Sequence, residues 1–358
     1  MIDNTVGSDD KSALQAKFDA QKIAFAPIMF QAAKALRDLG ILEYLKTAGK
    51  KGAEINTVAT NLKLPEYGVK VLLEAGLSLE MVRLQNDRFV LTKTGFFILR
   101  DKITQVNMDF VNDINYLGMS HLQESVRNGK PEGLKVFGDW QTIYEGLSEL
   151  PEQARESWFA FDHYYSDYAF SELMPLVFES NPEKILDVGG NTGKFSIRCA
   201  EYNKSVSLTI LDLPGQIKVA QENIEQMGYE NRISTIGLDL LDNSAHFPAG
   251  FDIIWMSQFL DCFSQQEILG LLKRAYNAMD LNSVLYILET FWDKQRFEAS
   301  TYSLHATSLY FTCMANGNSQ MYHSEDMINL VDKAGLFVEE SCEDVGISHT
   351  LFKCRKKK

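Results

Sequence analysis

The sequence predicts an α/β protein in which a doubly wound sheet follows an N-terminal region of helices. The first observation is the run ILDVGGNTG, residues 185–193, in which an apolar strand leads through glycines into a helix. The second is the alternation of apolar runs with helical patterns over residues 182–358, the pattern of a mostly parallel sheet covered on both faces. The third is the helical spacing of apolar residues over 13–39.

The composition is that of an ordinary globular protein. At 358 residues, with 45% hydrophobic and 23% charged residues, the chain can form two domains with their own cores. A net charge of −13 argues against nucleic acid as a partner, since phosphate binding needs a basic surface. The sequence has no run of about 20 apolar residues, so no membrane span is expected, and its polar, acidic N-terminus lacks the apolar core of a signal peptide. We therefore expect a cytoplasmic protein.

The five cysteines do not indicate a metal site. Their number is odd, they are scattered along the chain, and no C-x-x-C pair is present. Neither a zinc site nor a disulfide framework is therefore expected. This agrees with a reducing compartment.

The N-terminal part divides into a tail and a small helical domain. Residues 1–12 are polar and predict a disordered tail. Residues 13–102 predict a helix that stops at Gly40, a second helix, two short helices over 55–65 and 66–82, and a hairpin that turns at Asn86 and Asp87. Two helices followed by a two-stranded hairpin form a winged-helix pattern. The second of these helices carries one lysine and two glutamates over 66–78, which disfavours DNA binding.

Residues 103–181 predict long helices rich in aromatic residues and methionine. Most of these side chains should pack in a core, and a few should line a pocket for an aromatic substrate, because ligand sites often form beside such walls. His121, Asp162 and His163 lie in this region. A single histidine or aspartate in such a setting is more often a structural group than a catalyst.

From Pro182 the sheet begins. We expect strands over 184–188, 206–211, 233–237, 252–256, 283–289, 336–341 and 349–354. The last two are so close in sequence that they predict a terminal hairpin.

The glycine run and the acids that follow it predict a nucleotide-type site. Gly189 and Gly193 allow a ligand to approach the backbone, and Asn191 tolerates the positive φ that a glycine would otherwise supply. Asp212 follows the second strand, 25 residues after Asp187. An acid at this place typically binds ribose hydroxyls. Asp187 itself is expected to be structural.

With these motifs in place, the chain resembles the S-adenosylmethionine-dependent O-methyltransferases of the caffeate and hydroxyindole type from about residue 24 to 353. ILDVGGNTG resembles the family's glycine motif, LDLP (211–214) its ribose motif and LDLLD (238–242) its adenine motif. The run at 251–267 lies in the position of the catalytic motif. The resemblance implies a Rossmann-like methyltransferase domain over 182–358 and a winged-helix dimerisation domain over 13–102, hence a homodimer.

The resemblance also assigns the cofactor residues. It implies that Asp212 and Leu213 bind the ribose, that Asp239 and Leu240 contact the adenine edge and face, and that Ser257 approaches the amino-acid end of S-adenosylmethionine. Gly189 and Gly193 complete the set. The other partner would be a small-molecule methyl acceptor.

The catalytic motif departs from the family pattern, which has a histidine in an L-H-D-W-like run. An ungapped alignment puts Asp261 at the histidine, Cys262 at the aspartate and Phe263 at the tryptophan; a shift by one residue leaves Leu260 at the histidine. In both alignments the histidine is absent. One supporting acid is kept as Glu289, and the other position falls near Gln320 or Met321.

Three interpretations of this departure stay open. Asp261 is the base, with its pKa raised by burial and by Glu289; or no base is needed, because the acceptor is acidic or a carboxylate; or base-driven transfer is lost. His305 and His323 are further candidates for the base. The rival functions are an NAD-dependent oxidoreductase, a DNA-binding regulator that senses a ligand, and a cofactor-binding protein with altered or lost transferase activity.

Overall fold

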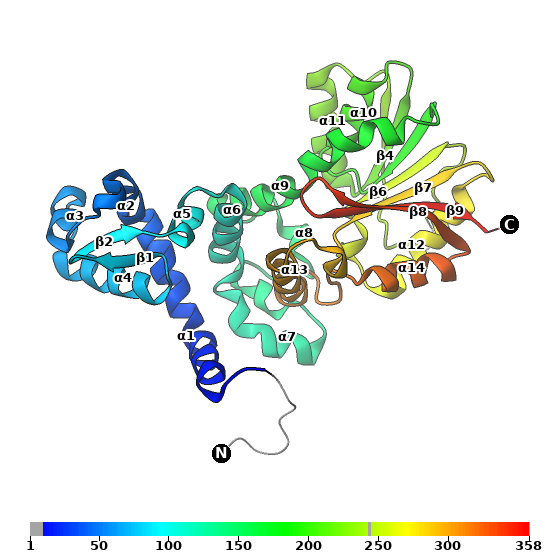
Figure 1. Cartoon of the computed structure of the whole chain (residues 1–358). Helices are drawn as coiled ribbons and strands as arrows, with labels where there is room; N and C mark the ends of the chain where they lie inside the picture. Colours follow the sequence, from blue (N-terminus) through cyan, green and yellow to red (C-terminus); the bar gives the residue numbers. More distant parts are fainter. Residues whose placement is uncertain (1–9, 243–244, 358) are drawn as a thin grey trace. The chain divides into compact units, whose positions relative to one another are not determined.

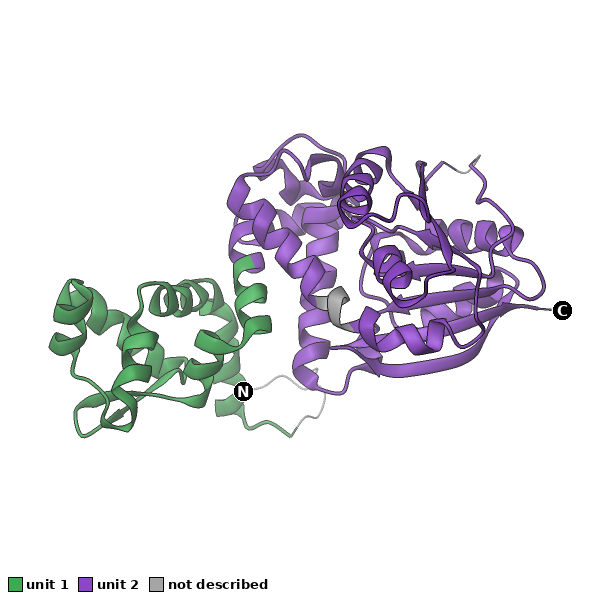
Figure 2. Cartoon of the chain, turned by 90° about the horizontal axis from the view of Figure 1, so that it is seen from above, with its two compact units in different colours: residues 1–109 green, residues 110–358 purple. Residues whose placement is uncertain are grey.

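The computed structural model of the chain describes residues 10–242 and 245–357, except for the side chains of residues 165–168. The chain forms two compact units, residues 1–109 and 110–358 (Figure 2). The predicted tail lies outside the described residues over 1–9, and the expected division between residues 103–181 and 182–358 falls within the second unit. Each unit is described by itself.

The first unit has the predicted winged-helix pattern. Its helices are α1 (Ala13–Asp38), α2 (Ile41–Ala48), α3 (Ile55–Leu62), α4 (Glu66–Ser78) and α5 (Lys93–Arg100), with a 3₁₀ turn at Gly49–Lys51. Strands β1 (Val82–Gln85) and β2 (Arg88–Leu91) pair antiparallel. The predicted turn residues Asn86 and Asp87 have φ of 48° and 59°, the positive values that a type I′ hairpin turn requires. Apolar residues from all these helices and both strands form one core around Leu36, Leu45 and Leu73.

Residues 102–177 form one long helix and several short segments. The short ones are α6 (Lys102–Phe110), a π-helical turn at Val111–Asn115, 3₁₀ turns at Gly118–His121 and Glu132–Val136, α7 (Leu122–Asn128) and α8 (Ile143–Gly146); the long one is α9 (Glu152–Val177). The prediction of long helices is therefore wrong before residue 152. Glycines and Pro131 interrupt this stretch. A Cβ on Gly118 would lie 2.1 Å from the Met314 sulfur, and one on Gly133 would lie 2.5 Å from the Gly118 carbonyl oxygen.

The rest of the second unit is a seven-stranded sheet (Figure 1). Its strands are β3 (Lys184–Val188), β4 (Ser207–Asp212), β5 (Ile233–Gly237), β6 (Ile253–Ser257), β7 (Val284–Glu289), β8 (Leu336–Val345) and β9 (His349–Lys356). They are arranged β5-β4-β3-β6-β7-β9-β8. Only β9 runs antiparallel to its neighbours, β7 and β8. The predicted strands and the terminal hairpin are confirmed.

Helices cover both faces of this sheet. They are α10 (Lys194–Tyr202), α11 (Pro214–Met227), α12 (Gln265–Ala278), α13 (Glu298–Tyr310) and α14 (Ser324–Lys333), with 3₁₀ turns at Leu260–Cys262 and Trp292–Lys294 and a π-helical turn at Phe311–Ala315. Figure 1 shows α10 and α11 on one face and α12 and α14 on the other. An apolar core lies on each face of the sheet, and alternate residues of β6 contribute to them. Ile254 and Met256 pack in the core on the side of α12, whereas Ile253 and Trp255 pack in the core on the side of α9 and α10.

The strand order creates one crevice. The chain leaves β3 toward β4 on one side, whereas β6 lies on its other side. At such a switch point, the loops after the two neighbouring strands diverge and leave a site at their carboxyl ends. A ligand site is therefore expected between the loops that begin at Gly189 and Gln258.

A separate apolar core, the aromatic cluster, fills the second unit beside the sheet. Its members come from α6, α8, α9, α13 and both π-helical turns, and they include Phe110, Ile114, Ile143, Trp158, Tyr310, Phe311, Met314 and Met321. Phe110 and Phe161 stack with ring centroids 4.0 Å apart. Many of these side chains are the aromatic and methionine residues of the predicted helical region.

Candidate functional site

The glycine turn after β3 has the backbone that the sequence predicts. Gly189, Asn191 and Gly193 have φ of 75°, 48° and 81°, so Asn191 does adopt the left-handed conformation that a glycine would take easily. A Cβ on Gly189 would lie 2.3 Å from the ring of Phe259, which excludes any larger residue there. Gly193 is the N-cap of α10, and a Cβ added there would lie 3.4 Å from Ile210 and 3.7 Å from Ala220, so it would point into the core.

Asp212 ties the turn to the end of β4. One carboxylate oxygen accepts the Asn191 N–H at 2.7 Å, and the other accepts the Leu213 N–H at 2.7 Å. Burial raises the pKa of Asp212, and these two hydrogen bonds oppose the shift. Asp212 is therefore a turn-forming residue, and each of its oxygens keeps a lone pair for a further donor.

Asp187 is a buried acid under the same turn. Only 2% of its surface is exposed, and its carboxylate accepts a hydrogen bond from the Ser196 hydroxyl at 2.7 Å. Burial raises its pKa to about 7, the Ser196 hydrogen bond lowers it, and the nearby Asp212 raises it further. At neutral pH the group is thus held between its charged and neutral forms.

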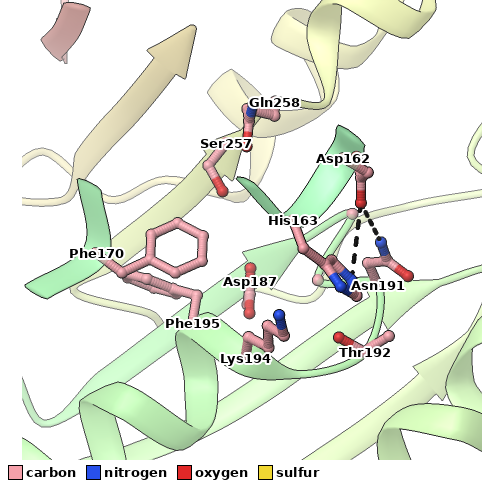
Figure 3. Close-up of a pocket in the computed structure, with 12 residues that line it drawn as sticks. Asp162, His163, Phe170, Asp187, Asn191, Thr192, Lys194, Phe195, Ser257 and Gln258 are labelled. Carbon is pink, nitrogen blue, oxygen red and sulfur yellow. Dashed lines mark hydrogen bonds and ion pairs between the residues drawn. The ribbon is translucent and has the colours of Figure 1, made fainter. Parts of the chain in front are cut away.

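A cavity opens at the predicted crevice (Figure 3). It is lined by the glycine turn, by the first residues of α10, by Ser257 and Gln258 after β6, and by residues of α9. Ser257 therefore lines the same cavity as the glycine turn. Gln258 has a φ of 45° and donates its N–H to the Leu288 carbonyl at 2.9 Å. A left-handed non-glycine residue at such a place is often associated with function.

Helix α9 supplies two polar side chains to this cavity, Asp162 and His163. Figure 3 shows both beside Asn191: the Asn191 amide donates to Asp162 at 3.4 Å, and the His163 ring nitrogen lies 3.9 Å from the same carboxylate. The third polar residue of this region, His121, is elsewhere and pairs with Glu124 at 3.1 Å. Sequence reasoning could not separate the three, since only the packing of α9 against the glycine turn does so.

The cavity lining offers acceptor oxygens and also the Lys194 ammonium, so it fits a ligand that carries both hydrogen-bond donors and a negative group. The side-chain oxygen of Asn191 is buried and has no hydrogen-bond partner among the described residues, and such a group normally needs a donor. Asp162 and Asp187 add acceptor oxygens to the same wall. An amino-acid end with an ammonium group, like that of S-adenosylmethionine, would supply the missing donors.

The two residues expected at the adenine lie outside this cavity's lining. Asp239 is exposed, and its carboxylate accepts the Leu241 N–H at 2.9 Å. Leu240 is only 4% exposed and belongs to the core beside α12, while its carbonyl oxygen accepts from Arg274. The side chain of Leu240 is thus directed into the core, whereas Asp239 is accessible to a ligand.

Two buried acids lie beside the aromatic cluster. Glu289, at the end of β7, accepts the N–H groups of Phe259 and Leu260 at 3.0 and 2.8 Å through one oxygen. Its other oxygen is buried without a partner among the described side chains and backbone groups. Burial raises the pKa of Glu289 well above its usual range, and the negative charge of Asp261 adds to this. Glu289 therefore holds the turn that carries Asp261.

Asp261 is 8% exposed, and burial raises its pKa to about 6. The Cys262 thiol donates to its carboxylate at 3.5 Å and opposes the shift. Leu260 is fully buried in the core beneath the sheet. Leu260 thus packs in the core of the sheet, whereas the charge of Asp261 reaches Tyr144 and Tyr310 of the aromatic cluster.

Three residues near Asp261 were not singled out by the sequence. Trp158 donates its indole N–H to the Tyr310 hydroxyl at 2.8 Å. Burial raises the pKa of Tyr310, and the charges of Asp162 and Asp261 contribute to the rise. The pKa of Tyr144 is raised well above its usual value by burial, with Cys262 and Asp261 adding to it. These phenols stay protonated and can donate hydrogen bonds near the two acids.

The remaining candidates for a base have structural roles. His323 caps α14 by accepting the Glu325 N–H at 3.1 Å, and both His305 and His323 pack against Trp292 with ring centroids 5.0 and 4.8 Å away. Met321, one of the two residues near the position of the second supporting acid, receives a contact from the Thr290 hydroxyl at 3.4 Å. Asp261 and Glu289 stay the candidate acids on this side of the site.

Metal and membrane sites can be considered for the described residues. Among the side chains that the structure describes, which leave out those of residues 165–168, no group of three or more His, Cys, Asp or Glu is arranged to hold a metal ion. Within residues 10–242 and 245–357, no helix has both the length and the apolar composition needed to cross a bilayer.

The chain matches two protein families in sequence. The Dimerisation2-like domain matches residues 17–89, and the O-methyltransferase domain matches residues 119–337. The first match covers most of the winged-helix unit. The second covers the glycine turn, both buried acids and most of the aromatic cluster.

Individual relatives agree with these matches. The L-tyrosine C(3)-methyltransferase of Streptomyces lavendulae is 26% identical over 72% of this chain and 70% of its own length, and the acetylserotonin O-methyltransferase of Gallus gallus is 22% identical over 75% and 79%. The structure of the S-adenosylmethionine-dependent methyltransferase SibL superposes with a TM-score of 0.73 over 95% of this chain and 99% of its own, at 22% identity. The chain belongs to the O-methyltransferase domain family, and its cofactor is S-adenosylmethionine.

Proposed function

We propose that the protein transfers a methyl group from S-adenosylmethionine to a hydroxyl oxygen of a small aromatic molecule, with Asp261 as the base. The observation that carries this proposal is the buried pair of Asp261 and Glu289 beside the aromatic cluster. The pKa of Asp261, about 6, is high for an aspartate but leaves it ionised at neutral pH. A base with a pKa just below the working pH is effective in proton transfer.

The protein's part in the reaction is to hold the acceptor and to remove its proton. The cofactor supplies an electrophilic methyl group, which the acceptor oxygen attacks. Asp261 takes the proton from the acceptor hydroxyl, and Glu289 fixes the turn beneath it through the Phe259 and Leu260 N–H groups. Stacked rings such as Phe110 and Phe161 exclude water and offer a flat apolar surface for an aromatic acceptor.

A second acceptor atom is supported by the same geometry. Removing the proton of a phenol makes both its oxygen and the adjacent ring carbon nucleophilic. One relative is named as an L-tyrosine C(3)-methyltransferase and another as an acetylserotonin O-methyltransferase. A base placed near the phenol hydroxyl would serve transfer to either atom, so the methylated product of this protein will decide between oxygen and carbon.

The test is the substitution Asp261→Asn. Turnover on a phenolic acceptor should fall by about 10²–10⁴, the usual contribution of a general base. The affinity for S-adenosylmethionine, measured by calorimetry, should stay within about twofold, since Asp261 does not line the cofactor cavity. In the unsubstituted enzyme, turnover should fall as the pH drops below about 6. Unchanged turnover in the variant would mean that positioning alone drives the transfer, or that the acceptor is a carboxylate.

The cofactor residues form a second part of the proposal. We assign Gly189, Gly193 and Ser257 to the amino-acid end of the cofactor, Asp212 and Leu213 to the ribose, and Asp239 and Leu240 to the adenine. The exposed carboxylate of Asp239 supports its assignment, whereas the burial of Leu240 supports only a backbone contact. Asp239→Ala should weaken S-adenosylmethionine binding by about 1–3 kcal/mol; an unchanged dissociation constant would remove Asp239 from the site.

We also propose that the protein is a homodimer through α1. Leu14, Phe18, Phe25 and Ile28 lie on one face of α1 and are 81%, 58%, 54% and 65% exposed. Such a stripe marks an interaction surface, and it lies in the Dimerisation2-like domain. Phe25→Glu should yield a monomer in sedimentation velocity, whereas Ile23→Glu on the opposite face should not. A monomeric unsubstituted protein would refute the proposal.

A further inference from the structure

Helix α9 joins the cofactor cavity to the aromatic cluster through consecutive residues. Trp158, Phe159 and Phe161 belong to the cluster, and Asp162 and His163 line the cavity. Trp158 and Asp162 are four residues apart and therefore lie on the same face of the helix. Because Trp158 donates to the Tyr310 hydroxyl and Asp162 accepts from the Asn191 amide, the Asp162 carboxylate lies where the two spaces meet.

The surroundings of Asp162 agree with this position. We call the part of the site formed by Asp261 and the aromatic cluster the acceptor side. The charge of Asp162 is one of the causes, after burial, that raise the pKa values of the Cys262 thiol and the Tyr310 phenol, both on the acceptor side. Its side chain is 31% exposed, so a ligand in the cavity can reach it. Figure 3 shows Asp162 on the same side of the cavity as Asn191. Asp162 is thus a negative charge shared by both halves of the site.

A transferable methyl group must lie at this junction, since it has to reach the acceptor from the cofactor cavity. S-adenosylmethionine carries a positive sulfonium at the atom that bears the methyl group. The product, S-adenosylhomocysteine, has a neutral thioether there. The two compounds share the same ammonium, carboxylate, ribose and adenine. A carboxylate next to the sulfur would therefore attract the substrate form and not the product form.

We propose that Asp162 is a specificity-determining residue that makes the protein prefer S-adenosylmethionine over S-adenosylhomocysteine. The inference rests on the cofactor and on the division of the site into a cofactor cavity and an acceptor side. Two opposite charges a few ångströms apart in a partly buried site attract strongly, and this attraction is lost when the sulfur becomes neutral. Asp162 thereby favours release of the product after each transfer. His163, whose ring lies 3.9 Å from the carboxylate, helps to orient it.

The test compares the two compounds on the full-length protein. Asp162→Asn keeps an oxygen that can accept from the Asn191 amide but removes the charge. In calorimetry, the dissociation constant of S-adenosylmethionine should rise by about tenfold. The dissociation constant of S-adenosylhomocysteine should change by less than about twofold. Asp162→Glu should keep the preference for the charged compound. Glu156→Gln, an exposed acid on the same helix, is the matched control and should leave both constants unchanged.

Each result decides the question. Equal weakening of both compounds would mean that Asp162 binds a group they share, such as the ammonium, and would overturn the proposal. Unchanged constants would also overturn it. Tight binding of S-adenosylhomocysteine by the variant reports that it is folded, so a loss confined to S-adenosylmethionine cannot come from misfolding. Because no acceptor is present, the result is independent of Asp261: a failure of the proposed transfer would appear in turnover, and a failure of this inference only in the ratio of the two constants.

Discussion

The two halves of the site are built in different ways. The cofactor cavity rests on a short stretch of backbone, the glycine turn, which Asp212 joins to the next strand through the Asn191 N–H. The acceptor side is a set of side chains from distant parts of the chain: the hydrogen bond between Trp158 and Tyr310 joins residues 152 positions apart. The first half depends on backbone conformation, and the second on the packing of side chains.

Each half also contains a buried acid, and the two acids differ in their partners. Asp187 lies under the glycine turn and receives a hydroxyl hydrogen bond from Ser196. Glu289 lies under the turn of Asp261 and receives two backbone N–H groups. A carboxyl with few donors affects stability mainly through its titration, whereas one that satisfies buried donors does so through the hydrogen bonds themselves. Substitutions at three positions test the comparison of the two halves.

The largest expected effect is the pH dependence that Asp187 gives to stability. Its pKa in the folded protein is about 7, above the value of about 3.9 for an unfolded chain. The folded state therefore binds the proton more tightly, and this contribution is fully present below pH 4 and is lost as the pH rises through 7. The difference between the folded and the unfolded pKa corresponds to a contribution of about 4 kcal/mol to the free energy of unfolding.

The measurement is urea unfolding of Asp187→Asn and the unsubstituted protein from pH 4.5 to 8. As the pH rises, the unfolding free energy of the unsubstituted protein should fall relative to that of the variant, because Asn cannot ionise. Glu156→Gln, which changes an exposed acid, should follow the unsubstituted protein at every pH. Parallel curves for Asp187→Asn would show that Asp187 titrates normally in the folded state.

The next effect concerns Glu289 on the acceptor side. Glu289→Ala leaves the buried N–H groups of Phe259 and Leu260 without their acceptor, and each unsatisfied donor costs about 1–3 kcal/mol. We expect a loss of about 3 kcal/mol in thermal or denaturant unfolding. Glu289→Gln retains an oxygen acceptor and should lose less than about 1 kcal/mol. If both variants lost the same amount, the two hydrogen bonds would not be what holds this turn.

The smallest effect is expected in the glycine turn itself. Asn191 has a φ of 48°, which glycine adopts without strain, so Asn191→Gly should change stability by about 0.5–1 kcal/mol at most. Asn191→Val has a β-branched side chain at the same φ and should cost about 1–2 kcal/mol. The pair is compared by thermal unfolding. Equal stabilities would mean that backbone conformation is not the constraint in this half of the site.

The difference between the halves explains which residues the sequence reveals. The strands of the sheet, the hairpin at Asn86 and Asp87 and the positive φ of Asn191 depend on local patterns and are confirmed. Asp212 could be named as a ribose-binding candidate from its place after the second strand, but its hydrogen bond with the Asn191 N–H becomes evident only in the structure. The same reasoning fails where glycines permit close packing, as at Gly118 and Gly133, which a purely periodic pattern treats as part of long helices.

Residues brought together by tertiary packing could not be found in this way. Asp162 and His121 are both single polar residues in the aromatic helical region, and the sequence does not distinguish their roles. In the structure Asp162 lines the cofactor cavity, whereas His121 pairs with Glu124. Tyr310 becomes recognisable only through its contact with Trp158. Asp261 and Glu289 could be named because they fall at known motif positions, but their burial, and so the raised pKa of each, follows only from the packing around them.

Helix α9 constrains how this protein could acquire a new acceptor. It is a single element of 26 residues, about 39 Å long, and it carries Trp158 in the aromatic cluster, Asp162 in the cofactor cavity and Leu173 in the core of the sheet. Substitutions that reshape the acceptor side through α9 will therefore also change cofactor affinity, and their effects will not add independently. Changes on α8 or the π-helical turn after α13 avoid this coupling, so we expect variation in acceptor preference to accumulate there first.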